Sequence, residues 1–145
     1  MTNEFGEKVG RAYAVSPDGS RIVYDTSEPD GKESKLILSD INFKEKQIIA
    51  RSSRPFHYTA ASLRWSPDGT KIAYSYPVTD EKKDLRIRAA DGSWERTVST
   101  GKLQFIFFPE WSPDSTKLAL TLVEPGVSEI GILENFLPKT KLAAK

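Results

Sequence analysis

The chain has 145 residues, of which 28% are charged and 38% are hydrophobic, and its 21 Lys and Arg nearly balance its 20 Asp and Glu. This length suits one domain with its own core. A net charge of +1 argues against a dedicated binder of nucleic acid or of anionic membranes. No apolar run approaches the roughly 18 residues that membrane insertion requires.

The counts of cysteine and histidine narrow the chemistry further. The chain has no Cys and one His, which excludes disulfides, thiolate zinc sites, a Cys nucleophile and a multi-histidine metal site within one chain. We therefore expect no metal and no cofactor. Residues 1–8 lack the apolar stretch of a secretory signal. This predicts a cytoplasmic location, with a periplasmic one as the alternative if the chain is a mature or truncated form.

One segment occurs three times along the chain, at residues 16–24, 66–74 and 112–120. Each copy starts with Ser-Pro-Asp and passes through Lys or Arg into three consecutive apolar residues. Trp65 and Trp111 precede the second and third copies, and Val15 takes that place in the first. The spacings of 50 and 46 residues are typical of a β-propeller blade, which contains four short strands.

Short β-rich segments follow each Ser-Pro-Asp turn in a regular order. In chain order, the strands predicted after the turns lie at residues 21–26, 35–40, 46–51, 71–76, 84–89, 95–100, 117–123, 129–133 and, weakly, 140–145. Consecutive apolar residues indicate strands that are buried on both faces, as in a blade between two neighbours. No stretch has a sustained helical period, so helix should be minor.

The carboxylates of the three turns, Asp18, Asp68 and Asp114, recur at the same place in each copy. Asp and Ser side chains bond to nearby backbone in such turns. We therefore expect each Asp to cap its own turn rather than to join a metal or catalytic site. Ser115 stands where the other two copies have Gly, which predicts a more strained turn or one of another type.

The segment 65–74 resembles the repeat of TolB-type propellers, which are WD-like β-propellers. A relaxed form of the same repeat occurs in the propellers of prolyl-oligopeptidase and dipeptidyl-peptidase enzymes. The resemblance covers residues 10–145 as three repeats, and Val15 and Ser115 depart from it. It implies a scaffold for protein contacts, or a gating propeller attached to a hydrolase.

These patterns together predict an all-β fold of one domain, a partial propeller. It should contain three four-stranded antiparallel blades at about 10–51, 60–100 and 107–145. Known propellers close with about four to eight blades, so three blades leave two faces open. Either two copies form one six-bladed propeller, or the chain is a fragment of a longer one. We favour the homodimer, in which residues 22–24 of one copy, or their strand neighbours, meet residues 118–120 of the other.

Two connectors carry residue types that are common in binding sites. The first holds Arg54, Phe56, His57 and Tyr58, and the matching one, which spans 101–108, holds Phe105 and Phe107. Strand polarity places both connectors on one face of the propeller, and we expect binding residues there. The alternative for His57 is a packed surface loop, and the alternative for the second connector is packing between blades.

The first strand of each blade should line the central channel. Counting from the repeat makes Arg64 and Glu110 equivalent positions that point opposite to the tryptophans. They are channel candidates, either as an arginine–carboxylate site for a polar ligand or, as we favour, as a structural ion pair.

The function predicted from these features is a non-enzymatic scaffold for protein or peptide binding, with no catalytic residues. Residues 126–131 only partly match a nucleophile elbow, because Ile130 stands at its second Gly. Two alternatives stay open. One is a hydrolase or lyase in the channel that uses Glu110 and Arg64, and the other is a fragment of a peptidase-associated propeller.

Overall fold

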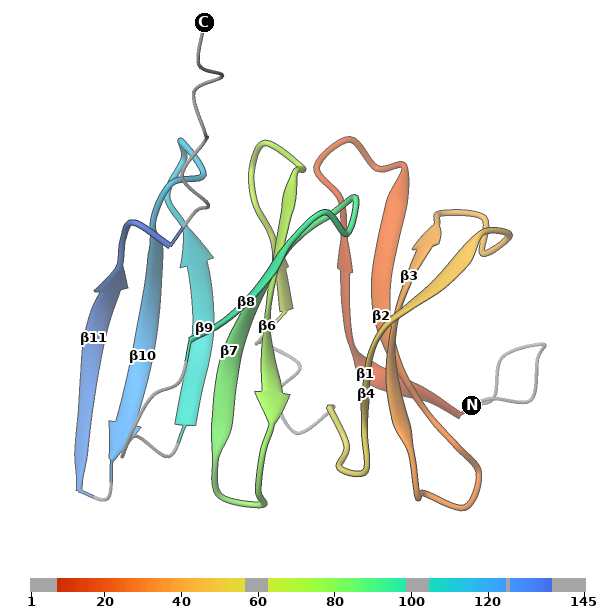
Figure 1. Ribbon diagram of the computed structural model, residues 1–145, viewed down its shortest axis with the longest axis horizontal. Helices are drawn as coiled ribbons and strands as arrows, with labels where there is room; N and C mark the ends of the chain where they lie inside the picture. Colours follow the sequence, from red (N-terminus) through yellow and green to blue (C-terminus); the bar gives the residue numbers. More distant parts are fainter. Residues whose placement is uncertain (1–7, 57–62, 99–104, 125, 137–145) are drawn as a thin grey trace, which may run out of the picture.

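The computed structural model describes residues 8–56, 63–98, 105–124 and 126–136. Three antiparallel sheets, here called blades 1 to 3, lie side by side in chain order (Figure 1). Blade 1 consists of β1 (Lys8–Val15), β2 (Arg21–Ser27), β3 (Ser34–Asp40) and β4 (Lys46–Ser52). Blade 2 consists of β5 (Leu63–Trp65), β6 (Lys71–Pro77), β7 (Lys83–Ala89) and β8 (Glu95–Val98). Blade 3 contains β9 (Phe105–Trp111), β10 (Leu118–Glu124) and β11 (Val127–Leu133).

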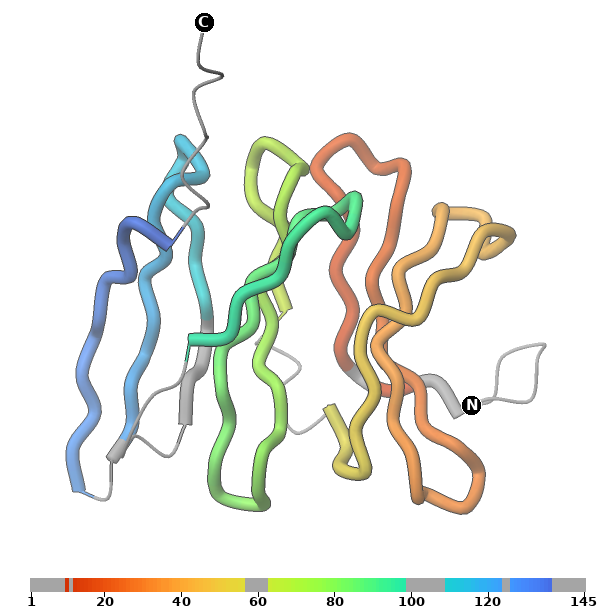
Figure 2. Tube along the Cα trace, in the orientation of Figure 1, coloured from red at the N-terminus to blue at the C-terminus, as the bar shows by residue number. Residues whose placement is uncertain are grey.

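The predicted all-β, antiparallel blade fold is confirmed. Within each sheet, strands that are consecutive in the sequence pair with each other, and Figure 2 shows the resulting row of three meanders. The fourth strand expected for blade 3, at residues 140–145, lies outside the described residues. Within the described part of the chain, no helix is long and apolar enough to cross a membrane.

The Ser-Pro-Asp turns lie together at one end of the blades, and the β2–β3 and β6–β7 hairpins lie at the other (Figure 1). In the first turn the Gly19 amide donates to the Ser16 carbonyl at 2.9 Å, and the Gly69 amide donates to the Ser66 carbonyl at 2.8 Å in the second. Gly19 and Gly69 adopt φ of +73° and +69°. Glycine tolerates this left-handed conformation without a steric cost.

The third turn has the same form as the other two although Ser115 replaces the glycine. The Ser115 amide donates to the Ser112 carbonyl at 2.8 Å, and Ser115 takes φ of +61°. The prediction of a strained turn is thus correct, and that of another turn type is wrong. The Ser115 side chain is buried, and its Oγ accepts a hydrogen bond of 3.0 Å from the Asp68 amide. The side chain that makes the backbone unfavourable therefore also joins blade 3 to blade 2.

Two apolar clusters hold the three blades together, one at each interface. The cluster between blades 1 and 2 contains Val23, Leu36, Leu38, Ala50, Phe56, Leu63, Trp65, Ile72, Tyr74 and Ala90. The cluster between blades 2 and 3 contains Ala73, Leu85, Ile87, Leu118, Leu120 and Phe136. Neighbouring residues of one strand enter different clusters, as Ile72 and Ala73 do, because side chains alternate between the faces of a sheet.

Both interfaces repeat the same tryptophan contact. The Trp65 indole donates to the Ala14 carbonyl of blade 1 at 3.1 Å, and the Trp111 indole donates to the Arg64 carbonyl of blade 2 at 3.5 Å. Ala14 and Arg64 are equivalent positions, each one residue before the last of the first strand. Each tryptophan thus anchors its blade to the first strand of the blade before it.

A cation lies over each of these tryptophans. The Arg21 guanidinium carbon is 4.9 Å from the centroid of the Trp65 ring, and the Lys71 ammonium is 5.8 Å from that of Trp111. Arg21 and Lys71 are again equivalent residues of the repeat. Such cation–π contacts contribute about 0.5–1 kcal/mol at exposed sites and more when desolvated. Each of the two interfaces between blades therefore pairs a cation from one blade with an indole from the next.

The prediction of which residues form the open faces of blades 1 and 3 is partly wrong. Val23 packs in the cluster between blades 1 and 2, while Leu118 and Leu120 pack in the cluster between blades 2 and 3. Consecutive apolar residues point to both faces of a strand, so only alternate residues remain available at an open face. Their strand neighbours, Ile22 and Ala119, occupy the opposite faces.

Candidate functional site

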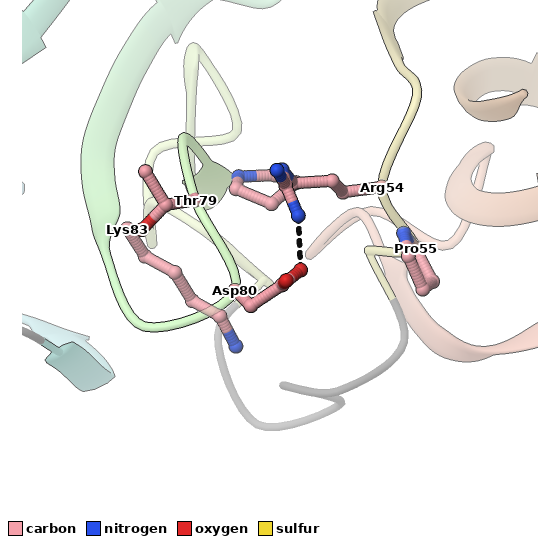
Figure 3. Close-up of a pocket in the computed structure, with 6 residues that line it drawn as sticks. Arg54, Pro55, Thr79, Asp80 and Lys83 are labelled. Carbon is pink, nitrogen blue, oxygen red and sulfur yellow. Dashed lines mark hydrogen bonds and ion pairs between the residues drawn. The ribbon is translucent and has the colours of Figure 1, made fainter.

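A hollow of about 210 Å³ opens on the hairpin end of the molecule, between blades 1 and 2 (Figure 3). It forms where the segment after β4 meets the β6–β7 hairpin. Its lining residues are Arg54, Pro55, Pro77, Thr79, Asp80 and Lys83. Of these, Arg54 was predicted from the sequence as a binding residue.

Local hydrogen bonds position both walls of the hollow. The Arg54 amide donates to Ser52 Oγ at 2.9 Å, which turns the chain at the end of β4. In the hairpin, the Val78 amide donates to the Lys82 carbonyl at 2.9 Å, and Thr79 Oγ1 accepts from the Lys82 amide at 2.9 Å. These contacts are short-range, so they follow from the sequence of each wall, while the pairing of the walls follows from the packing of the blades.

The hollow has a mixed charge with a cationic excess. The guanidinium of Arg54 forms an ion pair with the exposed Asp80 carboxylate, marked in Figure 3. Lys83 is only 6% exposed, and burial lowers the pKa of its ammonium. An exposed ion pair contributes at most about 1 kcal/mol. A carboxylate from another molecule can therefore replace Asp80 on Arg54 at little cost.

The other residues predicted for this face lie elsewhere or outside the described residues. Phe56 is buried and packs edge-on against Tyr76 with ring centroids 5.9 Å apart, so its prediction as a surface binding residue is wrong. It stabilises the interface between blades 1 and 2 instead. His57 and Tyr58 are outside the described residues.

Phe105 and Phe107 were expected in a connector, and the structure places them in β9. Their backbones pair with Val123 and Thr121 of β10. Four consecutive residues of high β-propensity, 105–108, extend the strand towards its N-terminus. That signal was present in the sequence, although residues 101–108 were interpreted as a connector.

The two channel candidates form an ion pair between adjacent first strands. Arg64 Nε of β5 lies 3.3 Å from Glu110 Oε1 of β9, with Arg64 partly exposed and Glu110 exposed. An arginine stays protonated in proteins and cannot act as a base. The pair therefore supplies one carboxylate and one fixed cation, which suits an ion pair or the binding of a polar ligand.

Each turn carboxylate makes its hydrogen bonds within its own turn. Oδ1 of Asp18 accepts from Ser16 Oγ at 2.6 Å and from the Ser20 amide at 3.1 Å. Asp114 does the same with Ser112 Oγ and the Thr116 amide, at 2.6 and 3.1 Å. The hydrogen bond from Ser16 lowers the pKa of Asp18 to about 2, and the one from Ser112 lowers the pKa of Asp114 to about 2.

Asp68 caps the second turn and also binds a lysine. Burial acts to raise the pKa of Asp68, but hydrogen bonds from Lys71 and Ser66 outweigh it and hold the pKa well below its usual range. The distance from Lys71 Nζ to Asp68 Oδ2 is 2.7 Å. Across the described ranges of the chain, no three His, Cys, Asp or Glu side chains converge as a metal site.

A buried carboxylate that sequence reasoning missed lies in blade 1. Asp25 is almost fully buried in β2, and its Oδ1 accepts a 2.8 Å hydrogen bond from the Ala12 amide. The contact lies at an irregularity in the β1–β2 register, and a Cβ at Gly10 would come within 2.1 Å of the carboxylate. Asp25 therefore satisfies the backbone of a bulge, and Gly10 provides the space for it.

The partial elbow motif is part of a regular strand. Ser128 belongs to β11 and pairs with Val123 of β10. A nucleophile elbow needs a sharp strand-to-helix turn, and the described residues after Ser128 continue as strand to Leu133.

Comparisons with known proteins agree with this architecture. The chain is 33% identical over 109 residues to the Tol-Pal system protein TolB of Alcanivorax borkumensis, which covers 74% of this chain and 24% of that protein. The structure of TolB from Acinetobacter baumannii superposes with a TM-score of 0.64 at 23% identity, covering 80% of this chain and 28% of that one. The β-propeller domain of the trilobed protease from Pyrococcus furiosus gives 0.65 at 17% identity, covering 88% and 39%.

The chain thus spans about a quarter of the curated relative that it matches. It matches no protein-family model. The structural likenesses are below 25% identity and concern the fold, which is that of a β-propeller.

Proposed function

The chain belongs to the TolB-type β-propeller family, and from that premise we propose that it is a non-enzymatic scaffold that binds a protein or peptide at its hairpin end. The observation that carries the proposal is the hollow where the Arg54–Asp80 ion pair lies beside the buried Lys83. The ligand group that suits this arrangement is a carboxylate, from an acidic side chain or a peptide C-terminus.

The binding step is an exchange of partners on Arg54. Asp80 is exposed at the tip of the hairpin and leaves the guanidinium without disturbing the fold. An incoming carboxylate takes its place and gains a charge-assisted hydrogen bond. Lys83 adds attraction from a partly desolvated position, where screening by water is weaker. The prolines Pro55 and Pro77 give the hollow two rigid walls.

Selection from a displayed library of random peptides on the immobilised protein tests this proposal. We expect enriched peptides with acidic residues, whose affinity falls at least tenfold in Arg54→Gln, since the loss of a charged hydrogen bond costs about 1.5–3 kcal/mol. Arg51→Gln is the matched control, because Arg51 also forms an exposed ion pair, with Glu33, but does not line the hollow. Asp80→Asn should raise the affinity, because it removes the internal competitor. Selected peptides that bind Arg54→Gln as well as the wild type would contradict the proposal.

We further propose that two copies of the chain associate to complete one propeller of six blades. Propellers have about four to eight blades, and the two open faces belong to the first and last blades of the same chain. Our alternative is that additional blades of a longer polypeptide cover these faces, as in a peptidase-associated propeller. For location, the similarity to TolB favours the periplasmic alternative, and the comparisons lend no support to a cytoplasmic one.

A second candidate is a hydrolase or lyase site at Arg64 and Glu110. It is supported by the solvent exposure of this ion pair on adjacent first strands. A screen for esterase, peptidase, glycosidase, lactonase and polysaccharide lyase activity distinguishes it from the scaffold. Turnover that is lost in Glu110→Gln, with binding at Arg54 unchanged, would favour the enzyme.

A further inference from the structure

The outer face of blade 3 repeats a face that blade 2 buries. Ile87 of β7 pairs with Ala73 of β6, and Ile132 of β11 pairs with Ala119 of β10 in the same way. Ile87 is fully buried against blade 3, whereas Ile132 is 60% exposed. Two residues earlier in each strand, on the same face, Leu85 is fully buried and its counterpart Ile130 is 80% exposed. Blade 3 therefore presents the surface that elsewhere in the chain receives another blade.

The outer face of blade 1 repeats the complementary surface. Leu63 and Trp65 of β5 insert against blade 1, and their counterparts in β1 are Tyr13 and Val15. Tyr13 is 68% exposed and Val15 is 44% exposed. Tyr24 of β2 lies on the same face but is only 4% exposed, and the ring of Phe43 meets it edge-on at 5.6 Å. At Tyr13 and Val15, blade 1 therefore presents the kind of surface by which blade 2 packs against blade 1.

We infer that the outer face of blade 3, formed by Ala119, Ile130 and Ile132, binds the outer face of blade 1 of a second copy, through Tyr13 and Val15, as the joint of a two-fold ring. The inference rests on the proposed completion of the propeller by two copies, and it names the surfaces. The interfaces between blades 1 and 2 and between blades 2 and 3 serve as its template. Because the two contacting faces differ, two joints related by one two-fold axis close the ring and leave no surface for a fibre.

The chemistry of this joint differs from that of the internal interfaces at one place. Lys117 is the counterpart of Arg21 and Lys71, which lie over Trp65 and Trp111. Across the joint, Val15 stands at the position equivalent to Trp65 and Trp111, and its side chain has neither an aromatic face nor a hydrogen-bond donor. Lys117 instead pairs with Glu134 of its own blade at 2.7 Å. The joint is therefore mainly apolar and is the weakest interface of the assembled propeller.

This difference gives a gain-of-function test. In Val15→Trp, the introduced indole would lie under Lys117 of the other copy and donate to its Glu110 carbonyl, as Trp65 and Trp111 do to Ala14 and Arg64. We expect the dimer dissociation constant, measured by sedimentation equilibrium, to fall at least about tenfold, given the usual strength of a desolvated cation–π contact and a hydrogen bond. Val15→Phe, which restores only the aromatic face, should tighten the dimer less.

Cross-linking identifies the faces directly. The chain has no Cys, so single-cysteine variants Val15→Cys and Ile132→Cys can be prepared separately, mixed, and treated with a short bis-maleimide. We expect linked dimers from the mixture and not from either variant alone, because the two-fold ring places Val15 of one copy near Ile132 of the other. Thr97→Cys, on the exposed part of β8, should not cross-link to either.

The possible results separate this inference from the proposed peptide site. A folded monomer at all concentrations, for the wild type and for Val15→Trp, would overturn the joint and favour additional blades of a longer polypeptide as its occupant. Dimers linked within the Ile132→Cys variant alone would overturn it in favour of packing between two third blades. Binding of acidic peptides to Arg54 does not depend on either result, since the hollow lies between blades 1 and 2.

Discussion

Blade 2 and its two neighbours are built from the same repeat but bury different amounts of it. Every residue of β7 in blade 2 except Asp84 and Arg86 is buried, whereas the equivalent strand of blade 3, β11, is exposed or half-buried throughout. The strands have similar apolar residues at equivalent positions, so their sequences do not account for the difference. The number of neighbouring blades does, since blade 2 has one on each face. Burial in a repeat structure thus depends on the stack as well as on the residue.

The largest effect should come from the tryptophan that joins blades 1 and 2. Trp65→Ala removes a buried ring and its hydrogen bond to Ala14, so the free energy of unfolding should fall by about 3–5 kcal/mol in urea titrations. The equivalent truncation on the open face, Val15→Ala, should cost less than about 1 kcal/mol in dilute solution. Equal losses for the two variants would show that blade 1 has no open face there.

The next comparison uses one residue type at two equivalent positions. Ile87→Ala should lower the free energy of unfolding by about 2–5 kcal/mol at every protein concentration, because Ile87 is fully buried. Ile132→Ala should change it by no more than about 0.5 kcal/mol in dilute solution, as exposed substitutions do. Thermal midpoints measured over a range of concentrations should separate the two variants further, because the wild type gains stability on association and Ile132→Ala gains less.

The third comparison concerns the turn of blade 3, where Ser115 stands in place of the glycine of the other two turns. Ser115→Ala keeps the left-handed backbone but loses the hydrogen bond to the Asp68 amide, so we expect a loss of about 1–2 kcal/mol by chemical denaturation. Ser115→Gly relieves the backbone strain while losing the same bond, and its loss should be smaller. A larger loss for glycine than for alanine would mean that the side chain matters more for packing than for this bond.

The smallest effect should be the pH dependence of the turn caps. The pKa of Asp18 and of Asp114 is lowered from 3.8 to about 2 in the folded chain. A carboxylate with a lowered pKa stabilises the fold above its unfolded pKa and loses that contribution as the pH falls. Stability should therefore decline between pH 3.8 and pH 2, and Asp18→Asn should make the decline shallower. Titration of the carboxyl ¹³C signals would show a midpoint near 3.8 if the caps were absent in solution.

Much of the fold could be predicted from local patterns. The three Ser-Pro-Asp turns and the strands directly after them depend on residues close together in the chain, and the structure contains these turns and strands. The hollow at Arg54 could be predicted only in part. Asp80 and Lys83 carry no signal of their own, because they lie in an ordinary polar hairpin, and they reach Arg54 only when blades 1 and 2 pack together.

The sequence pattern accounts for the propeller blades, because turn chemistry and consecutive apolar residues act within one repeat. It did not determine which of those apolar residues would face which neighbour, nor that Phe56 would be buried while Ile130 stays exposed. Those outcomes depend on the side-chain alternation of paired strands and on the number of blades in the stack. Both are properties of the assembled sheets, and they cannot be inferred from the residues of one repeat alone.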